Sequence, residues 1–363
     1  MQKQPLSQIF EPPQPGSHVS EIETPSLLIN LDRMEANIQR MQARCDALGL
    51  AFRPHIKTHK TPEIARMQLQ AGAVGIACQK TSEAAVFAAA GFNDIQLPYN
   101  VVGAKKTARL ADLALYNRIT VTVDHLNVVA GLAEAASKDD PTIRVLIELA
   151  TPIRRTGAQP HEVVQIAQRI EGEERMHFAG IMAYPSNVET RPIIQEALDY
   201  LNRAGIGVDI VSGGGTGAAL VADQIPELTE LRVGTYIFND WVTVLLGWAK
   251  PEDCALTIAT TVVSRPEEDR GILDAGSKTL SSDRVNNLYG HIVEYPEAQI
   301  YQLNEEHGFV DFSACDDRPD IGEVVHVIPM HVCVAVNLHD QLFGIRGEQV
   351  EHVWNVAARG KVW

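Results

Sequence analysis

The sequence predicts an α/β fold in which a TIM-type (β/α)8 barrel precedes a C-terminal antiparallel, β-rich domain. From about residue 26 to residue 240, short apolar runs alternate with helical stretches, which is typical of parallel β/α units. There are about eight such units, the number that closes a TIM-type barrel. After residue 240 the long helical stretches stop, and turns rich in Pro, Gly and Asp separate the apolar runs. On the rhythm alone, a doubly wound open sheet is the alternative for the first part.

The apolar runs of the first part are the predicted barrel strands. They cover residues 51–56, 75–78, 94–97, 119–123, 144–149, 179–183, 208–211 and 231–238. Helices are expected between them over residues 62–71, 82–90, 126–137, 160–170 and 190–204. A strand over residues 26–30 and a helix capped by Asp32 come before these units.

The remaining apolar runs are the expected strands of the β-rich domain. They cover residues 256–263, 290–294, 322–328, 332–336, 341–345 and 351–356. We expect the early strand over residues 26–30 to pair with this domain. The predicted division is an N-terminal arm over residues 1–25, a barrel over residues 26–240 and the β-rich domain over residues 241–363.

Composition and charge argue against several classes of protein. With 363 residues, 45% of them hydrophobic, the chain can bury a large core. The net charge of -15 disfavours a nucleic-acid surface. No apolar run approaches the roughly 20 residues of a membrane span, and the first residues lack the apolar core of a secretory signal. We therefore expect a cytoplasmic protein that binds neither nucleic acid nor membrane. The five scattered cysteines, without a CxxC pair, argue against a disulfide framework.

The stretch RPHIKTHK, residues 53–60, is the most unusual segment of the chain. It places Lys57 at the end of the first predicted barrel strand, where an ammonium group loses hydration unless it is paired or exposed. Loss of hydration favours the neutral, nucleophilic amine that Schiff-base chemistry requires. The ordinary alternative is a rim lysine whose stem covers apolar surface.

Other unusual residues also follow predicted strand ends, where TIM barrels carry their active sites. The turn SGGGTG, residues 212–217, opens a helix and can bind phosphate through backbone N–H groups, although it can also be a plain tight turn. A lysine and a phosphate site at one barrel mouth indicate pyridoxal 5'-phosphate. The candidate cofactor-binding residues are Lys57, Gln79, Arg155, Tyr184, Ser212, Gly213, Gly214, Gly215, Thr216, Gly217 and Tyr236. The ordinary alternatives are a surface ion pair for the arginine and core positions for the tyrosines.

A second cluster lies in the β-rich domain, where His331 and Cys333 occupy a predicted strand. Residues i and i+2 of a strand share one face, so the two side chains are expected to point the same way. An imidazole and a thiolate presented together suit zinc and leave positions open for water or substrate. The alternative is a buried histidine beside a buried free cysteine.

Several motifs together resemble the D-threonine aldolase and D-serine dehydratase family. They are RPHIKTHK, CQKTSEA from Cys78, GGGTG, LDAGSK from Leu273, NEEHG from Asn304 and HVCVAVNLHD from His331. The family consists of fold-type III pyridoxal-phosphate enzymes akin to alanine racemase, and the resemblance runs from about Thr24 to the C-terminus. It implies a homodimer with the site near the interface.

The resemblance also implies roles for individual residues. Lys57 is the expected Schiff-base lysine, and the turn over residues 213–217 holds the cofactor phosphate. Arg155 matches an arginine near the pyridine nitrogen, and Tyr184 and Tyr236 flank the cofactor or the substrate. The candidate catalytic residues are Lys57, His55 and Tyr184. The expected ligands of a divalent metal, zinc or manganese, are His331 and Cys333.

Two reactions remain open within this family. The motif His331-x-Cys333 resembles the dehydratases, because the aldolases typically carry His-x-Asp at this place. After Tyr184 the chain has PSNVE, where the aldolases tend to carry His-Gly. CQKTSEA, GGGTG, NEEHG and VNLHD are closest to the aldolase branch. We therefore expect a lyase that cleaves β-hydroxy-D-amino acids to glycine and an aldehyde. The alternative is dehydration of D-serine or D-threo-3-hydroxyaspartate; an amino-acid racemase and a non-catalytic cofactor carrier come after it.

Overall fold

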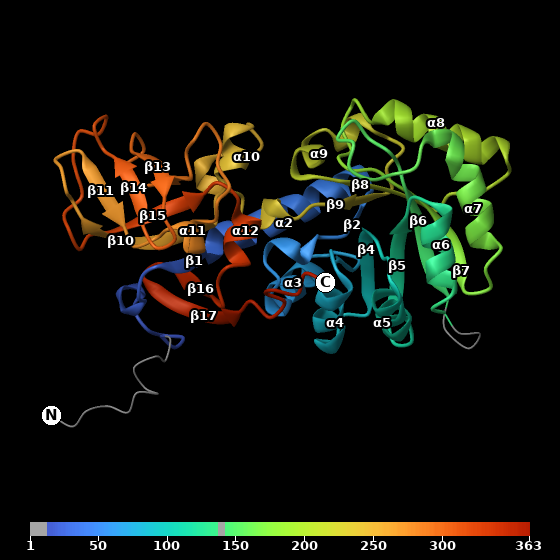
Figure 1. Cartoon of the computed structure of the whole chain (residues 1–363), viewed down its shortest axis with the longest axis horizontal. Helices are drawn as coiled ribbons and strands as arrows, with labels where there is room; N and C mark the ends of the chain where they lie inside the picture. Colours follow the sequence, from blue (N-terminus) through green and yellow to red (C-terminus); the bar gives the residue numbers. More distant parts are fainter. Residues whose placement is uncertain (1–12, 137–141) are drawn as a thin grey trace, which may run out of the picture. The chain divides into compact units, whose positions relative to one another are not determined.

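The computed structural model describes residues 13–136 and 142–363, which form two compact units. One unit, here called the β unit, joins the chain up to Asn37 to Ile237–Arg359. The other, the barrel unit, comprises Ile38–Tyr236 and Gly360–Trp363. Helix α2 (Leu31–Leu48) begins in the β unit and continues in the barrel unit (Figure 1). Asn30 caps this helix in place of the predicted Asp32, because its Oδ1 accepts from the Arg33 N–H at 2.9 Å.

In the described part of the barrel unit, eight strands form a parallel sheet in the order β2-β9-β8-β7-β6-β5-β4-β3. Their bounds are β2 (Ala51–Phe52), β3 (Ile76–Ala77), β4 (Asp94–Asn100), β5 (Arg118–Val123), β6 (Ile143–Glu148), β7 (Met176–Met182), β8 (Ile210–Gly214) and β9 (Glu230–Arg232). An isolated parallel bridge between His55 and Ala77 joins the two ends of this order, and the Ala77 N–H donates to the Pro54 carbonyl at 2.8 Å. Because neighbouring strands follow one another along the chain, the sheet is TIM-like and the doubly wound alternative is excluded.

Helices alternate with these strands and cover the outside of the sheet (Figure 1). Their bounds are α3 (Pro62–Gln70), α4 (Thr81–Ala89), α5 (Ala104–Ala114), α6 (Leu126–Ala133), α7 (Val163–Glu171), α8 (Arg191–Arg203) and α9 (Thr216–Leu220). Short 3-10 helices connect elements in both units: η1 (Val19–Glu21), η2 (Ile56–Thr58), η3 (Pro160–Glu162), η4 (Ala222–Gln224), η5 (Thr235–Ile237) and η6 (Pro251–Asp253). The helix expected over residues 126–137 ends at Ala133, and residue 137 lies outside the described residues. No described helix is both long and apolar enough to span a bilayer.

The β unit is built on a nine-stranded sheet, counted over its described residues, in the order β13-β14-β11-β10-β1-β16-β17, with β15 pairing β10 and β12. Its strands are β1 (Ser26–Asn30), β10 (Leu256–Ser264), β11 (Arg270–Leu273), β12 (Gly290–Ile292), β13 (Gln299–Leu303), β14 (Gly308–Asp311), β15 (Val324–Pro329), β16 (Gln341–Arg346) and β17 (Gln349–Asn355). Strand β1 is antiparallel to β10 and parallel to β16. Leu28, Ala259, Phe343 and Ile345 form a buried cluster there. Residues 1–12 of the expected arm lie outside the described residues.

One predicted strand is wrong, and another is wrong in part. Residues 332–336 form helix α12 (Val332–Val336), because the buried Asp240 accepts from the Val332 N–H at 3.1 Å and satisfies the first turn from 92 residues away. The predicted strand over residues 231–238 ends at Arg232, and Tyr236 lies in η5. The remaining helices of the β unit are α10 (Trp241–Leu245), which Asp240 also caps, and α11 (Ser277–Leu280).

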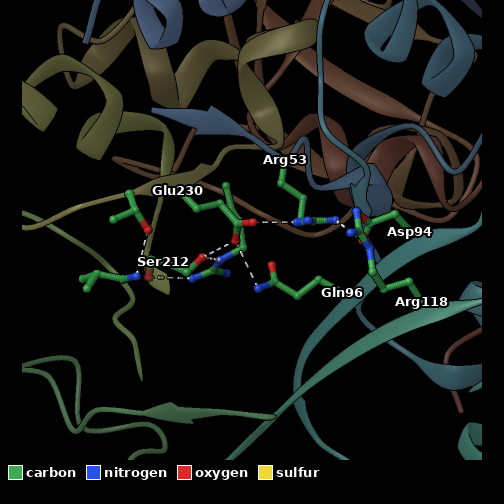
Figure 2. A network of polar contacts seen from close by, with 9 residues as sticks. Arg53, Asp94, Gln96, Arg118, Ser212 and Glu230 are labelled. Atoms are coloured by element: carbon green, nitrogen blue, oxygen red, sulfur yellow. Dashed lines mark hydrogen bonds and ion pairs between the residues drawn. The ribbon is translucent and has the colours of Figure 1, made fainter. Parts of the chain in front are cut away.

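A chain of buried polar side chains crosses the inside of the barrel sheet (Figure 2). The Arg53 Nε donates to Glu230 Oε2 at 2.7 Å, and its Nη1 donates to Asp94 Oδ1 at 2.8 Å. Glu230 Oε1 in turn accepts from Ser212 Oγ at 2.6 Å and from Gln96 Nε2 at 3.1 Å. These bonds connect the end of β2 with β9, β4 and β8. The buried ion pairs of Arg53 with Glu230 and Asp94 therefore link strands on both sides of the His55–Ala77 bridge that closes the sheet.

Arg232 extends this network toward the carboxyl ends of the strands. It follows Glu230 by two positions on β9, so both side chains point to the inside of the sheet in successive layers. Its Nε donates to Ser212 Oγ at 2.8 Å. Burial lowers the pKa of the Arg232 guanidinium to about 10, although Glu230 and Glu148 oppose that effect. Ser212 therefore connects a buried carboxylate with a buried guanidinium.

Replacing Arg53 with Met is expected to lower the free energy of unfolding by about 3–5 kcal/mol, because Glu230 would keep a buried charge without its cation. Urea unfolding measures the loss. The matched control is Arg169→Met, which removes an ion pair with Glu173 on the surface of α7 and should cost less than about 1 kcal/mol. Equal losses in the two variants would contradict the structural importance of the buried network.

Candidate active site

Lys57 is set apart by its exposure. Of residues 52–60, all of them described, it alone is partly exposed, and the others are buried. It lies in η2, directly after the extended residues that continue β2. The other lysine of this stretch, Lys60, forms an ion pair, with its Nζ 3.6 Å from Glu83 Oε1. The Lys57 side chain is therefore the cation that this turn presents at the carboxyl ends of the barrel strands.

A glycine just after β9 lets the Lys57 turn approach closely. A Cβ at Gly234 would lie 2.8 Å from Thr58 Oγ1 and 3.0 Å from the His55 carbonyl oxygen, closer than side chains tolerate. The His55 N–H also donates to the Val233 carbonyl at 2.9 Å. Gly234 thus allows the backbone on both sides of Lys57 to pack against the end of β9.

His55 orients its neighbours as a neutral imidazole. Its Nδ1 accepts from the Lys57 backbone N–H at 3.4 Å, so its protonated Nε2 donates to Gln79 Oε1 at 3.0 Å. Burial lowers the pKa of His55 well below its usual value, and the cationic Lys57 and Arg232 lower it further. His55 therefore connects Lys57 with Gln79 and is held in one tautomer.

The glycine-rich turn is anchored on one side and open on the other. The Gly214 N–H donates to Ser186 Oγ at 3.0 Å, and Gly215 takes a φ of +109°, which favours glycine. The Thr216 and Gly217 N–H groups, at the start of α9, meet no acceptor among the described residues. Amides in this arrangement suit a phosphate. The Ser212 hydroxyl, by contrast, is already used by Glu230 and Arg232 beneath the turn.

Tyr184 and Arg155 lie together beside this turn. The Arg155 guanidinium carbon is 4.7 Å from the centre of the Tyr184 ring, a cation–π geometry. Its Nη2 lies 3.6 Å from Glu148 Oε1. Burial raises the pKa of the Glu148 carboxyl, and the Thr156 hydrogen bond and Arg155 counteract this effect. A Cβ at Gly214 would lie 3.3 Å from both the Tyr184 ring and Arg232 Nη2, so both groups border the turn.

A cavity of about 370 Å³ opens at the ends of β3, β4 and β6. It is lined by Gln79, Pro98, Tyr99, Asn100, Val102, Lys106, Glu148, Arg155 and Thr156. Two predicted site residues, Gln79 and Arg155, therefore meet at one cavity. Tyr236 does not line it: its hydroxyl accepts from Gln68 Nε2 at 2.8 Å, and its ring packs against Phe52 at 5.5 Å. Burial raises the pKa of this tyrosine, as expected of a core position.

The predicted metal motif forms a cluster of its own in the β unit. His331 precedes α12 and Cys333 lies within that helix, and a hydrogen bond to Cys333 raises the pKa of His331 to about 9, with Asp283 adding to the effect. The His331 Nδ1 lies 2.7 Å from Asp283 Oδ2. Over the described residues, no three His, Cys, Asp or Glu side chains are arranged to hold a metal. The cluster offers two possible metal ligands, the His331 imidazole and the Cys333 thiol, and the Asp283 carboxylate hydrogen-bonds to the imidazole. This arrangement fits a divalent metal whose other coordination positions are open.

Sequence reasoning missed Arg232, Gly234, Glu148, Lys106 and Asp283. Glu148 ends a predicted strand, so the rule that site residues follow strand ends could have found it. Arg232 and Gly234 were taken as parts of one apolar run. Lys106 lies on the helix that was not predicted, and Asp283 lies 48 residues from His331, without a local signal.

Buried histidines near Lys57 predict a loss of stability in acid. Burial lowers the pKa of His59 to about 4, so below about pH 6.5 the unfolded chain binds a proton that the folded chain rejects. The free energy of unfolding should therefore fall between about pH 6.5 and 4, and less steeply in His59→Gln. Urea unfolding at pH 7 and pH 5 measures the difference, with His161→Gln on the surface as the control. The same pH dependence in His59→Gln and wild type would refute this origin.

Two family models match the chain. One is described as the alanine racemase N-terminal domain and covers residues 29–240; the other is a putative serine dehydratase domain over residues 255–345. A D-threonine aldolase from Arthrobacter sp is 36% identical, with 96% of each chain covered. A 3-hydroxy-D-aspartate aldolase from Paracoccus denitrificans (strain Pd 1222) is 32% identical over 96% of this chain and 95% of its own.

Solved structures agree with these matches. The D-threonine aldolase from Filomicrobium marinum superposes with a TM-score of 0.86 at 30% identity, covering 97% of this chain and 100% of its own. A metal-free Cys→Ala variant of D-threo-3-hydroxyaspartate dehydratase superposes with a TM-score of 0.85 at 26% identity, covering 93% and 98%. This chain therefore belongs to the D-threonine aldolase and D-serine dehydratase family of fold-type III pyridoxal-phosphate lyases.

Proposed function

We propose that this protein is a pyridoxal-phosphate- and divalent-metal-dependent lyase that cleaves β-hydroxy-D-amino acids to glycine and an aldehyde. The observation that carries this proposal is the Lys57 turn. It presents a partly exposed lysine among buried residues, in a chain 36% identical to a D-threonine aldolase. The aldolases among the relatives cover nearly the whole chain, which favours the same reaction here.

The residues at the barrel mouth fit the cofactor. Lys57 would hold its aldehyde carbon, and the open N–H groups of Thr216 and Gly217 would hold its phosphate. Once bound, the cofactor supplies an electron sink for the bond that breaks at Cα. Neutral His55 keeps the Gln79 amide in place, and Arg155, stacked on Tyr184, would lie near the pyridine nitrogen of the cofactor.

The motif in the β unit fits a metal. His331 and Cys333 would be its protein ligands, and Asp283 would hold the imidazole through Nδ1, which leaves Nε2 for the metal. When bound, the metal supplies a Lewis acid for the β-hydroxyl oxygen. A thiolate ligand favours zinc over manganese. One solved relative is a Cys→Ala variant of D-threo-3-hydroxyaspartate dehydratase in its metal-free form, which supports metal binding in this family.

Dehydration is the second candidate reaction. Cys333 stands where the aldolases of the family typically carry aspartate, and a D-threo-3-hydroxyaspartate dehydratase from Delftia sp. (strain HT23) is 30% identical over 86% of this chain. In this reaction, β-elimination yields a 2-oxo acid and ammonia. The aldolase reaction is preferred because the relative with the higher identity is an aldolase.

We also propose that the protein works in the cytoplasm as a homodimer. The family resemblance supports the dimer. Light scattering of the purified protein tests the dimer directly, and a monomeric mass would refute it.

Product analysis tests the reaction. The purified protein, loaded with pyridoxal phosphate and either zinc or manganese, is given D-threonine, D-serine or 3-hydroxy-D-aspartate, and glycine and ammonia are measured separately. We expect glycine and an aldehyde from D-threonine without ammonia. The matched variant Lys57→Ala should lose both turnover and the visible absorbance of bound cofactor. Ammonia together with a 2-oxo acid would instead establish the dehydratase reaction.

Metal affinity tests the second motif without relying on turnover. Zinc binding is measured by competition with a chromophoric chelator. Asp283→Asn should weaken binding about 10- to 100-fold by loosening His331, and Cys333→Ala should weaken it further while retaining the visible absorbance of bound cofactor. Asp316→Asn, an exposed aspartate in the same unit, is the control. Wild-type affinity in both Asp283→Asn and Cys333→Ala would show that the metal binds elsewhere.

A further inference from the structure

We propose that Asp240 is a positioning residue for the metal motif of the β unit. Its carboxylate holds the backbone on which His331 and Cys333 are presented together, although it is not itself one of the proposed ligands. This inference rests on the proposed metal site and adds to it a residue far away in the sequence. It assigns Asp240 a role in metal affinity, beyond its role as a helix cap.

The Asp240 carboxylate caps two helices at once. The residue is buried, with 2% of its surface exposed. Its Oδ1 accepts from the Thr243 N–H at 2.9 Å in the first turn of α10, and its Oδ2 accepts from the Val332 N–H at 3.1 Å in the first turn of α12. Each oxygen thus satisfies a backbone group that its own helix leaves open. Asp240 therefore ties the first turns of α10 and α12 together.

Two hydrogen bonds to this segment flank His331. The Val332 N–H, directly after it, donates to Asp240, and the Met330 carbonyl, directly before it, accepts from the Val242 N–H at 3.3 Å. Together they join residues 240–242 to residues 330–332. His331 is held between them in an extended conformation, with φ at -136° and ψ at 102°, and the helix begins at the next residue.

This backbone conformation brings the two proposed ligands into contact. His331 is the N-cap residue of α12, and Cys333 is the second residue of that helix. The side chain of an N-cap residue lies over the second and third helical residues. The hydrogen bond between the His331 and Cys333 side chains, which raises the pKa of His331, agrees with this placement. In a continuous strand the two residues would instead be about 6.6 Å apart along the chain.

Asp240 also leaves the His331 imidazole free for a metal. An N-cap residue usually satisfies the first turn with its own side chain, but His331 makes no such bond to the helix. Its Nδ1 lies 2.7 Å from Asp283 Oδ2, so its Nε2 is the nitrogen left for the metal. After Cys333 and Asp283, the charge of Asp240 adds to the rise of the His331 pKa. The same negative charge would favour a divalent cation at this place.

An aromatic stack holds the start of α10 against the strand that leads to His331. The rings of Trp241 and His291 lie parallel, with their centroids 3.7 Å apart and an angle of 3° between their planes. His291 belongs to β12, where it pairs with Ile328 of β15. Strand β15 ends at Pro329 and runs directly into the metal motif. The residue next to Asp240 is therefore fixed on the same strands as the proposed ligands.

Cobalt binding to two variants tests this role. Asp240→Asn keeps the volume of the side chain, but it loses the charge and offers one acceptor to two N–H groups. The cobalt(II) affinity of this variant, loaded with pyridoxal phosphate, should fall about tenfold or more. Thr243→Val is the matched control, because it removes only the hydroxyl bonds to the Asp240 backbone, at 3.0 and 2.7 Å. It should unfold at a lower urea concentration than wild type and bind cobalt as wild type does.

The absorption of bound cobalt reports this site directly. Its ligand-field bands lie at longer wavelengths than the bands of pyridoxal phosphate, and Cys333→Ala identifies those that depend on the thiol. Wild-type affinity in Asp240→Asn, or an equal loss in Thr243→Val, would overturn the role of Asp240 alone. Absence of Cys333-dependent bands in wild type would overturn both this inference and the proposed metal motif. The expected affinities without glycine release from any β-hydroxy-D-amino acid would refute only the lyase reaction.

Hydrogen exchange in wild type tests the same role without a variant. Because Asp240 is present before any metal binds, the amides of residues 332–336 should already exchange slowly in the protein free of divalent metal. Mass spectrometry of the peptide that contains them measures the rate. Fast exchange that slows only when cobalt is added would show that the metal, and not Asp240, orders this helix.

Discussion

The buried ion pair between Arg53 and Glu230 is the interaction on which the barrel unit depends. A charged pair inside a sheet is costly to desolvate, and it is tolerated here because Asp94, Gln96 and Ser212 satisfy the remaining hydrogen-bonding positions. Against the effect of burial, Glu230 and Asp94 raise the pKa of Arg53, so this arginine stays charged. The pair joins the first strand of the barrel to the last and holds Ser212 below the glycine-rich turn.

The site is assembled on this support in successive layers. Ser212 accepts a hydrogen bond from Arg232, and both Arg232 and Tyr184 border Gly214. The turn at Gly214 leads to the first N–H groups of α9, which meet no acceptor among the described residues. Just after the end of β9, Gly234 leaves room for the Lys57 turn. Lys57 and the amides that we propose to bind phosphate are thus carried by strands that the same buried charges hold in register. The chemistry that the family shares therefore rests on a structural element that contacts no ligand itself.

The sequence predicted the parts of this arrangement that depend on periodicity. Alternating strands and helices predicted the barrel, and the position of Lys57 after an apolar run predicted its place at the strand ends. Contacts between distant residues could not be predicted in this way. Asp240 accepts a hydrogen bond from the Val332 N–H, and residues 332–336 form a helix where a strand was predicted. Gln68 donates a hydrogen bond to the Tyr236 hydroxyl and holds that side chain in the core. The roles proposed for the individual residues of the site stay predictions.

Locating the cofactor on the chain tests the central claim most directly. The holoenzyme is treated with borohydride, which fixes the cofactor to the amine that holds it, and the labelled peptide is identified by mass spectrometry. The account predicts one pyridoxyl group, on Lys57. A label on Lys60, whose ammonium is paired with Glu83, or on any other lysine would contradict it.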